Sequence, residues 1–315
     1  SVFDRQINPE RPIYKLDKRK IAIIKVLITA MLWGTTYVLV SLGLQEMGPL
    51  MLAGIRYTLA GLILLPVLKS NHLDLREYKK YFWQLAALGV FSFTLGNGFV
   101  GFALEHLPST SVSLMSNLSA PLIMMAGAFF LKETPAPIQV IGILVVFAGM
   151  ALYFNPREFA GLNIGYLFMA ISLLSFTVYN LLGRYLARSG AMPFLIQTTI
   201  PFIIGGGILV VLALILEGMP VFSMRSILII LFMVLFNSIT GYLLYNQALA
   251  ELTAIEVNII LKLSPFFTAV YAWVLLGETI TSMQILAMVI AFAGIYLVQK
   301  GPDLLRGSHT NLPSQ

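Results

Sequence analysis

The chain has 315 residues, of which 58% are hydrophobic and only 11% are charged, and its mean hydropathy is +0.87. Soluble domains carry about 25% charged residues, so this composition excludes a large soluble domain and indicates a membrane protein. Cys is absent and the three His lie far apart, outside the apolar segments, so we expect no disulfide, no metal site and no cofactor. The formal net charge of +6 does not indicate nucleic acid as a partner, because the basic residues lie at the ends of hydrophobic segments and form no patch interleaved with aromatic residues.

Ten segments are long and apolar enough to be membrane spans, which need roughly 20 residues each. We expect residues 1–20 to be a basic cytoplasmic tail that lies against anionic lipid, and residues 301–315 to be a disordered cytoplasmic tail. The first apolar run is too long for a signal-peptide core and no small-residue cleavage site follows it, so it is predicted to be an uncleaved span. The predicted spans are 21–44, 50–68, 82–104, 109–131, 137–154, 162–186, 193–216, 226–249, 254–276 and 282–299.

Proline marks several of the predicted helix starts, where its missing N–H costs no hydrogen bond. These residues are Pro49, Pro108, Pro137 and Pro193. The stretches around Glu46 and Glu217, each followed by Gly and Pro, are typical of short turns.

The basic residues orient this map. With the amino terminus inside, fifteen Lys and Arg lie in cytoplasmic segments, whereas the opposite side holds only Arg157 and Arg225. Such an excess agrees with the positive-inside rule, and it predicts that both termini are cytoplasmic in the plasma membrane. Three basic residues fall within spans: Lys25, Arg56 and Lys262.

The two halves of the chain resemble each other when the second is shifted by 145 positions. The identities include polar and aromatic residues that apolar helices rarely share by chance, and they lie in one ungapped register. They pair Leu118-Ser119 with Leu263-Ser264, Glu133-Thr134 with Glu278-Thr279, Gln139 with Gln284, and Phe147-Ala148-Gly149 with Phe292-Ala293-Gly294.

An odd number of spans per copy means that the second copy enters the membrane from the opposite side. We therefore predict an all-α membrane protein with two inverted five-helix repeats, at 21–155 and 156–300. In transporters, inverted repeats place the substrate near the bilayer midplane and supply the two conformations of alternating access. The alternative is a duplicated structural bundle that transports nothing.

Several motifs resemble those of the EamA-type transporters of the drug/metabolite transporter superfamily. They are Trp33-Gly34-Thr35-Thr36-Tyr37, Arg56-Tyr57-Thr58-Leu59-Ala60, Leu276-Gly277-Glu278, and the Gln139 and Gln284 segments that end in Phe-Ala-Gly. The resemblance covers roughly residues 21–299 and implies ten helices and transport of small metabolites, often export of amino acids or related compounds. The chain departs from the family pattern at Phe176-Thr177 and at Lys262.

Lys262 lies about eight residues into the ninth span, where a Lys costs roughly 2.5–3.5 kcal/mol on insertion scales. It could bind a substrate carboxylate, act as a proton-linked switch, or be structural through an ion pair with Glu256 or by snorkelling. The shift of 145 pairs Asn117 with Lys262 and Ser113 with Asn258. Ser113 and Asn258 each lie one helical turn before their partners Asn117 and Lys262, on the same helix face. Two polar stripes are therefore expected to face a central cavity, unless they only bond the helices together.

Further polar and aromatic residues lie in spans one, three, six and eight. They could line the same cavity, where aromatic rings could stack on a substrate, or they could simply pack. These candidates for substrate binding are Asn97, Trp33, Tyr37, Tyr179, Asn180, Tyr242, Tyr245 and Asn246.

Pro121 and Pro265 interrupt spans four and nine at nearly equivalent depth, and we interpret them as gating hinges. Arg56 lies seven residues into span two, where it could close a gate or snorkel to lipid headgroups; snorkelling is the interpretation we prefer.

The leading hypothesis is a secondary transporter of small polar metabolites, with a proton or an exchanged substrate as the coupling partner, because the chain has no Walker-type nucleotide loop. The alternatives are a channel or a non-transporting receptor. An enzyme is not expected, because acidic residues in the spans are scarce and no His lies within a span. Spans five and ten have few polar groups and are expected to form scaffold or dimer contacts, which leaves both a monomer and a homodimer open.

Overall fold

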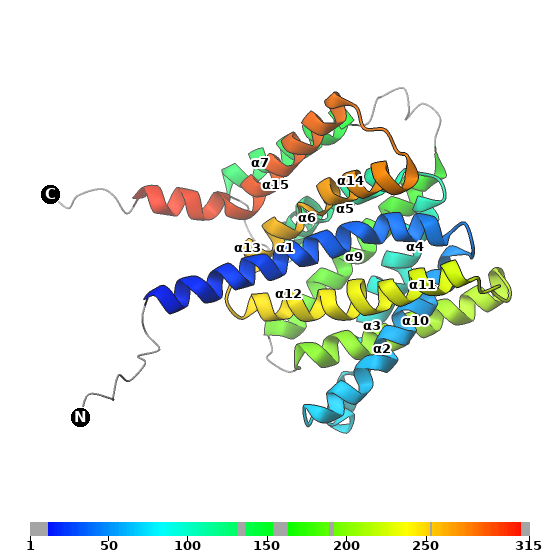
Figure 1. The fold of residues 1–315 in the computed structure, drawn as a ribbon. Coiled ribbons are helices and arrows are strands. Elements are labelled where there is room, and N and C mark those ends of the chain that lie inside the picture. Colours follow the sequence, from blue (N-terminus) through cyan, green and yellow to red (C-terminus); the bar gives the residue numbers. More distant parts are fainter. Residues whose placement is uncertain (1–11, 131–135, 154–162, 189–191, 253, 310–315) are drawn as a thin grey trace, which may run out of the picture.

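The computed structural model describes residues 12–130, 136–153, 163–188, 192–252 and 254–309. Within these ranges the chain forms helices, turns and bends and contains no strand (Figure 1). Nine of the described helical segments are long and apolar enough to cross a membrane, and a shorter apolar helix, α7, completes the set (Pro137–Tyr153). This arrangement confirms the prediction of an all-α membrane protein with ten spans.

The first half contains five spans. Three of them are single continuous helices, and the other two consist of several shorter helices. Their elements are α1 (Pro12–Gly43) and α2 (Pro49–Ser70); then η1 (Leu75–Tyr81), α3 (Phe82–Gly89), η2 (Val90–Asn97) and α4 (Gly98–Leu104); then α5 (Ser109–Ser116) and α6 (Ser119–Phe130); and α7.

The second half repeats this pattern. Its elements are α9 (Ile164–Arg188) and α10 (Phe194–Leu216); then α11 (Met224–Phe232), η3 (Met233–Thr240) and α12 (Gly241–Leu249); then α13 (Ala254–Leu261) and α14 (Ser264–Leu276); and α15 (Ser282–His309).

The irregular parts of the two halves coincide, which supports the internal repeat. The third and eighth spans each contain a π-helical stretch, η2 and η3. The fourth span breaks at residues 117–118 and the ninth at residues 262–263. Each break lies just before a proline, Pro121 or Pro265, because a proline ring lacks the N–H and clashes with the carbonyl of the residue four positions earlier.

Equivalent helices of the two halves also pack against each other: α2 packs on α10, and α7 packs on α15. Glycine makes the second contact close. A Cβ built on Gly149 would lie 2.6 Å from the backbone nitrogen of Ala291, and one on Gly142 would lie 2.8 Å from the carbonyl of Gly294. Figure 1 shows α7 and α15 together along one edge of the bundle.

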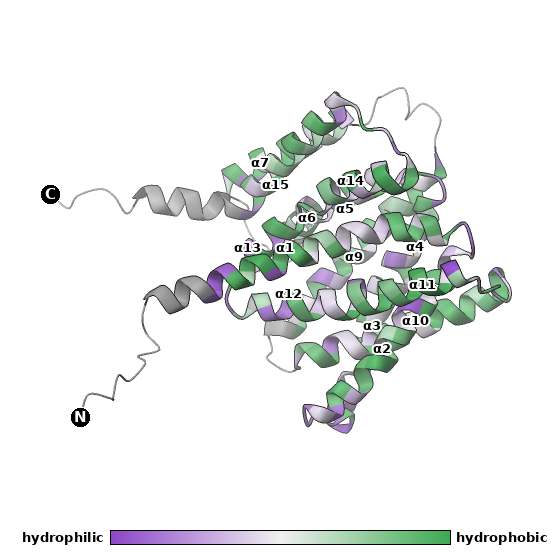
Figure 2. Ribbon diagram, viewed as in Figure 1, coloured by the Kyte–Doolittle hydropathy of each residue, from purple (hydrophilic) through white to green (hydrophobic). Residues whose placement is uncertain are grey.

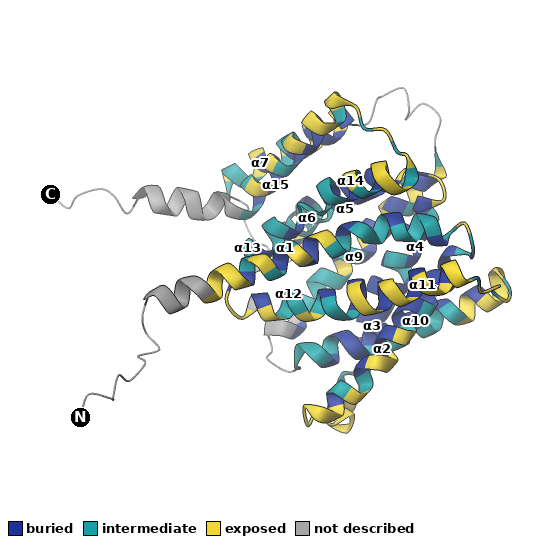
Figure 3. Cartoon of the chain, in the orientation of Figure 1, coloured by how far each residue is buried: buried dark blue, intermediate teal, exposed yellow. Residues whose placement is uncertain are grey.

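The outer surface is apolar, as expected for a protein surrounded by lipid. Phe129 and Trp273 are 80% and 65% exposed, whereas Asn237 and Arg56 are buried. Hydrophobic residues colour the outer faces of the helices in Figure 2, and the exposed residues in Figure 3 include those faces of α11 and α15. Side chains with polar groups thus gather inside the bundle and at its ends.

The two terminal segments differ from the expected tails. The first helix, α1, begins at Pro12, and α15 continues to His309, so residues 301–309 are helical where disorder was expected. The start of α1 and the end of α15 lie at the same end of the bundle, as an even number of spans requires (Figure 1).

Candidate functional site

A small cavity lies between helices of both halves. Its volume is about 20 Å³, which holds a single water-sized group. The bundle is therefore closed around this site. The lining residues come from α1 (Thr36, Tyr37, Val40), α2 (Pro49, Leu52, Ala53, Arg56, Tyr57), η2 and α4 (Asn97, Val100, Gly101, Leu104) and η3 (Met233).

Arg56 is the cation of this cavity. The residue is only 5% exposed, its Nε donates a hydrogen bond to Ser238 Oγ at 3.0 Å, and its guanidinium lies 4.8 Å from the centroid of the Tyr57 ring. The prediction that Arg56 snorkels to lipid headgroups is therefore wrong. Apolar residues occur all around α2, so the sequence has no stripe that shows which way this side chain faces.

The π-helical stretch η3 attaches the second half to α1 beside the cavity. Asn237 is fully buried, and its Nδ2 donates to Leu32 O at 2.9 Å and to Thr36 Oγ1 at 2.6 Å. The indole of Trp33 donates in turn to the carbonyl of Asn237 at 3.0 Å. Asn237 is not among the residues predicted from the sequence, although an amide in the middle of an apolar span is by itself a sign of a functional position.

Of the predicted substrate-binding residues, Tyr37 and Asn97 line the cavity. Asn97 donates its Nδ2 to Ser92 O at 2.8 Å, the carbonyl five residues earlier in the π-helical stretch. Its side-chain carbonyl keeps its capacity to accept a hydrogen bond, since the structure shows no donor to it among the described residues.

A second group of predicted residues forms an aromatic cluster. The Trp33 ring centroid lies 5.4 Å from that of Tyr242 and 5.8 Å from that of Tyr245. Tyr179 packs against the buried apolar cluster that includes Leu68 and Leu85. The four residues are half-buried, and in this structure their rings pack against one another and against apolar side chains.

Two predicted amides bond within their own helices. Asn180 donates to Phe176 O at 2.7 Å, and Asn246 donates to Tyr242 O at 2.6 Å. Neither amide is among the residues that line the cavity.

A third group lies where the two broken spans meet. Asn117 Nδ2 donates to Lys262 O at 3.3 Å, and Lys262 Nζ donates to Ser119 Oγ at 3.1 Å. Ser113 Oγ lies 3.0 Å from Thr268 Oγ1, and Asn258 lies one turn before Lys262 on α13. Asn117 and Lys262 thus bond across the two breaks, Ser113 bonds to α14, and none of the four predicted residues lines the cavity.

Glu278 ties the second half to the start of α5. It accepts hydrogen bonds from the backbone N–H of Ser109 at 2.7 Å and of Thr110 at 3.2 Å, and from Thr110 Oγ1 at 2.8 Å. Gly277 makes this possible: its φ of +69° ends α14 in a left-handed turn that most residues adopt at a cost. The partner motif at Glu133 lies outside the described residues.

Glu217 ties the second half to the start of α2 in the same way. Its two carboxylate oxygens accept from the backbone N–H of Leu50 at 2.8 Å and of Met51 at 2.9 Å. A carboxylate at a helix N-terminus both fills free N–H groups and complements the helix dipole.

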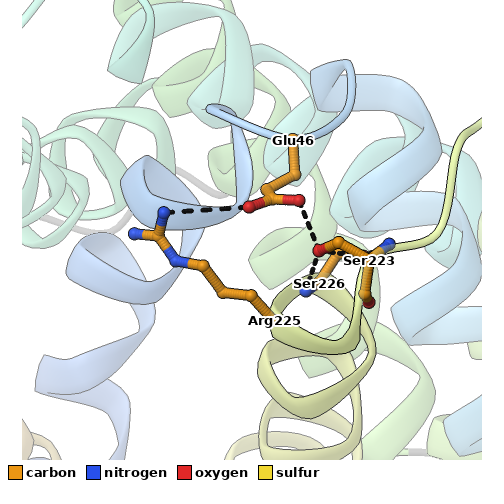
Figure 4. Close-up of polar contacts among 4 residues, drawn as sticks. All are labelled: Glu46, Ser223, Arg225 and Ser226. Carbon is orange, nitrogen blue, oxygen red and sulfur yellow. Dashed lines mark hydrogen bonds and ion pairs between the residues drawn. The ribbon is translucent and has the colours of Figure 1, made fainter.

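Figure 4 shows a third carboxylate contact at this end. Glu46 accepts from the Ser223 hydroxyl and lies 3.7 Å from the Arg225 guanidinium. Ser223 also accepts from the backbone N–H of Ser226 and so caps α11. Three acidic residues in connecting turns therefore hold the two halves together at the end where α1 meets α2.

Comparison with known proteins identifies the family of the chain. The EamA-like transporter family matches residues 20–155 and 163–299, which are the two halves described above. The chain belongs to the EamA-like transporter family. The chain is 25% identical to an uncharacterized transporter of Archaeoglobus fulgidus, over 86% of this chain and 94% of that protein.

Another EamA-like relative carries a more specific name. The chain is 24% identical to a probable amino-acid metabolite efflux pump of Salmonella typhimurium, over 86% of this chain and 92% of that protein. A solved crystal structure superposes with a TM-score of 0.65 at 18% identity, over 88% of this chain and 96% of that one, and supports the fold alone.

Proposed function

We propose that this EamA-like protein is a secondary transporter that moves small polar metabolites across the plasma membrane by alternating access, with both termini in the cytoplasm. Amino acids or related compounds are the proposed cargo, and export is the proposed direction. The observation that carries the proposal is the cavity with a buried cation, Arg56, between α1, α2, η2, α4 and η3, which come from both inverted halves. The name of the Salmonella relative supports the class of cargo.

The closed structure suggests how the two states differ. Pro49, Leu52 and Leu104 line the cavity, and the Glu217 and Glu278 contacts hold the helices at the end where α1 meets α2. Opening there requires these contacts to break, while the broken spans supply the bend. Pro121 and Pro265 are the proposed hinges, because each removes a backbone hydrogen bond at a break.

Uptake into proteoliposomes tests the function. The purified protein is reconstituted and given labelled amino acids, amines, nucleobases and sugar phosphates, with and without a pH gradient. We expect saturable transport of at least one class, and a change of rate with the gradient identifies proton coupling. No transport of any class would reject the proposal.

The second candidate is a channel, which the enclosed cavity disfavours. Steady conduction in a planar bilayer at rates far above those of a carrier would establish it.

Lys262 offers a separate test. If its ammonium binds cargo in an open state, Lys262→Ala should weaken the transport of anionic or zwitterionic solutes more than that of cationic ones. Equal losses for both would assign it to the Asn117 and Ser119 contacts alone, as a structural residue.

A further inference from the structure

We propose that Arg56 binds an anionic group, carboxylate or phosphate, of the transported solute, so that the cargo is an organic anion or a zwitterion. The inference rests on the proposed transport function and adds the substrate class. Its basis is a buried guanidinium that lines a cavity and has no ion-pair partner among the residues that the structure describes.

The sequence itself supplies almost no carboxylate for Arg56. Among the ten predicted spans the one acidic residue is Glu256, and it pairs with Arg19 at 2.5 Å. In water a lone guanidinium is well solvated, but in a closed bundle its burial is costly unless an anion compensates it.

Two carboxylates at the end where α1 meets α2 already have partners. Glu46 contacts Ser223 and Arg225, and Glu217 accepts from the N-terminal amides of α2. Among the described residues, then, Arg56 forms no ion pair. We therefore infer that the solute supplies the anion.

The guanidinium is held in place for such an anion. Ser238 accepts from Nε and the Tyr57 ring lies beside the group, whereas the terminal nitrogens make no hydrogen bond to any described residue. Their N–H groups form the planar fork that matches two oxygens of a carboxylate or phosphate. The side chain lines the cavity, so the fork is available there.

Two neutral groups in the same cavity fit the rest of a zwitterion. Thr36 Oγ1 accepts from Asn237, which leaves its own O–H free to donate to an anion. Asn97 uses its Nδ2 on Ser92, which leaves its Oδ1 to accept from an ammonium or hydroxyl group of the solute. An amino acid presents both kinds of group on one carbon.

The present volume of about 20 Å³ admits none of these solutes. Among the described residues, Met233 of η3 is the one lining residue from the second half, so a movement of η3 away from α2 widens the space beside Arg56. The solute therefore binds in an open state and closes the bundle by supplying the counter-charge.

Matched pairs of solutes test this assignment in proteoliposomes. Each acid is paired with the compound that lacks the anionic group: L-serine with ethanolamine, L-lysine with cadaverine, and glycerol 3-phosphate with glycerol. We expect the wild-type protein to transport at least one acid member about 10- to 100-fold faster than its partner, the range that a charged hydrogen-bonded pair provides. Comparison of the amino-acid pairs with the phosphate pair tells carboxylate from phosphate.

Arg56→Gln should abolish this preference by slowing the acid member while leaving the partner nearly unchanged. Arg56→Lys should retain part of it, because it keeps the charge but loses the fork. The control is Arg225→Gln, which removes a half-exposed guanidinium that lies near Glu46 and outside the cavity, and which should keep the full preference.

The outcomes separate the two proposals. Transport by the wild type without preference for the acid member, or an unchanged preference in Arg56→Gln, overturns the role of Arg56 and leaves the transport function standing. Absence of transport for every solute of the pairs and of the wider panel rejects both. If Arg56→Gln does not fold, Ser238→Ala decides: it should lower the rate for the acid member alone by a few-fold, and an equal loss for both members overturns the assignment.

Discussion

Replacing Glu278 with Ala should loosen the junction between α14 and α5. The carboxylate accepts three hydrogen bonds there, from the Ser109 and Thr110 amides and from the Thr110 hydroxyl. Ser109 and Thr110 are each only 1% exposed, so water cannot readily replace the lost acceptor. Hydrogen bonds to a charged group contribute about 1.5–3 kcal/mol each, and three that share one carboxylate are not additive, so we expect a loss of about 3–5 kcal/mol.

Two variants calibrate this magnitude. Glu278→Gln keeps a carbonyl that can accept one of the bonds, so about half of the loss should remain. Glu217→Ala removes two bonds instead of three, and the Glu217 carboxylate is exposed whereas Glu278 is half-buried, so its cost should be only about 1–2 kcal/mol. Glu77→Ala, at an exposed position in η1, should change nothing.

The assay can use the absence of Cys in this chain, because a single introduced thiol is then the only one. Val112 on α5 is fully buried, so Val112→Cys reports opening of the junction through its rate of reaction with N-ethylmaleimide in detergent. A loss of about 3–4 kcal/mol in the closed state corresponds to labelling that is 10²- to 10³-fold faster. Equal labelling rates and equal denaturation midpoints with and without Glu278→Ala would refute the reasoning.

Three further changes have defined expectations in thermal or denaturant unfolding of the purified protein. Gly149→Ala should destabilise the protein by about 1–3 kcal/mol, because the new Cβ would lie 2.6 Å from a backbone nitrogen of α15. The control Gly207→Ala places its Cβ in open space and should be neutral or slightly stabilising. Similar behaviour of the two variants would contradict the close packing of α7 on α15. Asn237→Leu should lower the stability by about 1–3 kcal/mol, because the hydrogen bonds from Asn237 to α1 are lost. Asn180→Leu loses only a bond within its own helix and should lower the stability by less than about 1 kcal/mol. A larger loss for Asn180→Leu would contradict the role of Asn237 in joining η3 to α1. Partial burial raises the pKa of Glu105, so the folded protein holds this proton more tightly than the unfolded chain, and stability falls as pH rises through the carboxyl range. Glu105→Gln should therefore raise the melting temperature slightly at pH 7 and leave it unchanged at pH 3. A lower melting temperature at pH 7 would contradict this prediction.

The fold could be predicted from the sequence because its signals are local. Spans are recognised from the length of apolar runs, and Pro49 and Pro137 start α2 and α7 where the turn pattern predicted them. The ungapped shift of 145 also had a structural counterpart, since the helix breaks at Asn117 and Lys262 obey it.

The site was predicted less well, because the direction of a side chain depends on packing. Tyr37 and Asn97 line the cavity, but Lys262 and Asn117, the sharpest candidates in the sequence, bond across the two helix breaks. Arg56 was assigned to the lipid headgroups and proved to be the buried cation.

The sequence alone determined that ten apolar helices cross the membrane as a duplicated set of five, because hydrophobic length and repeated residues are properties of the chain itself. Tertiary structure alone decided which polar groups share a cavity. A span such as α2 is apolar on all sides, so no stripe shows its inner face, and only the contact with η3 through Ser238 turns Arg56 toward the cavity.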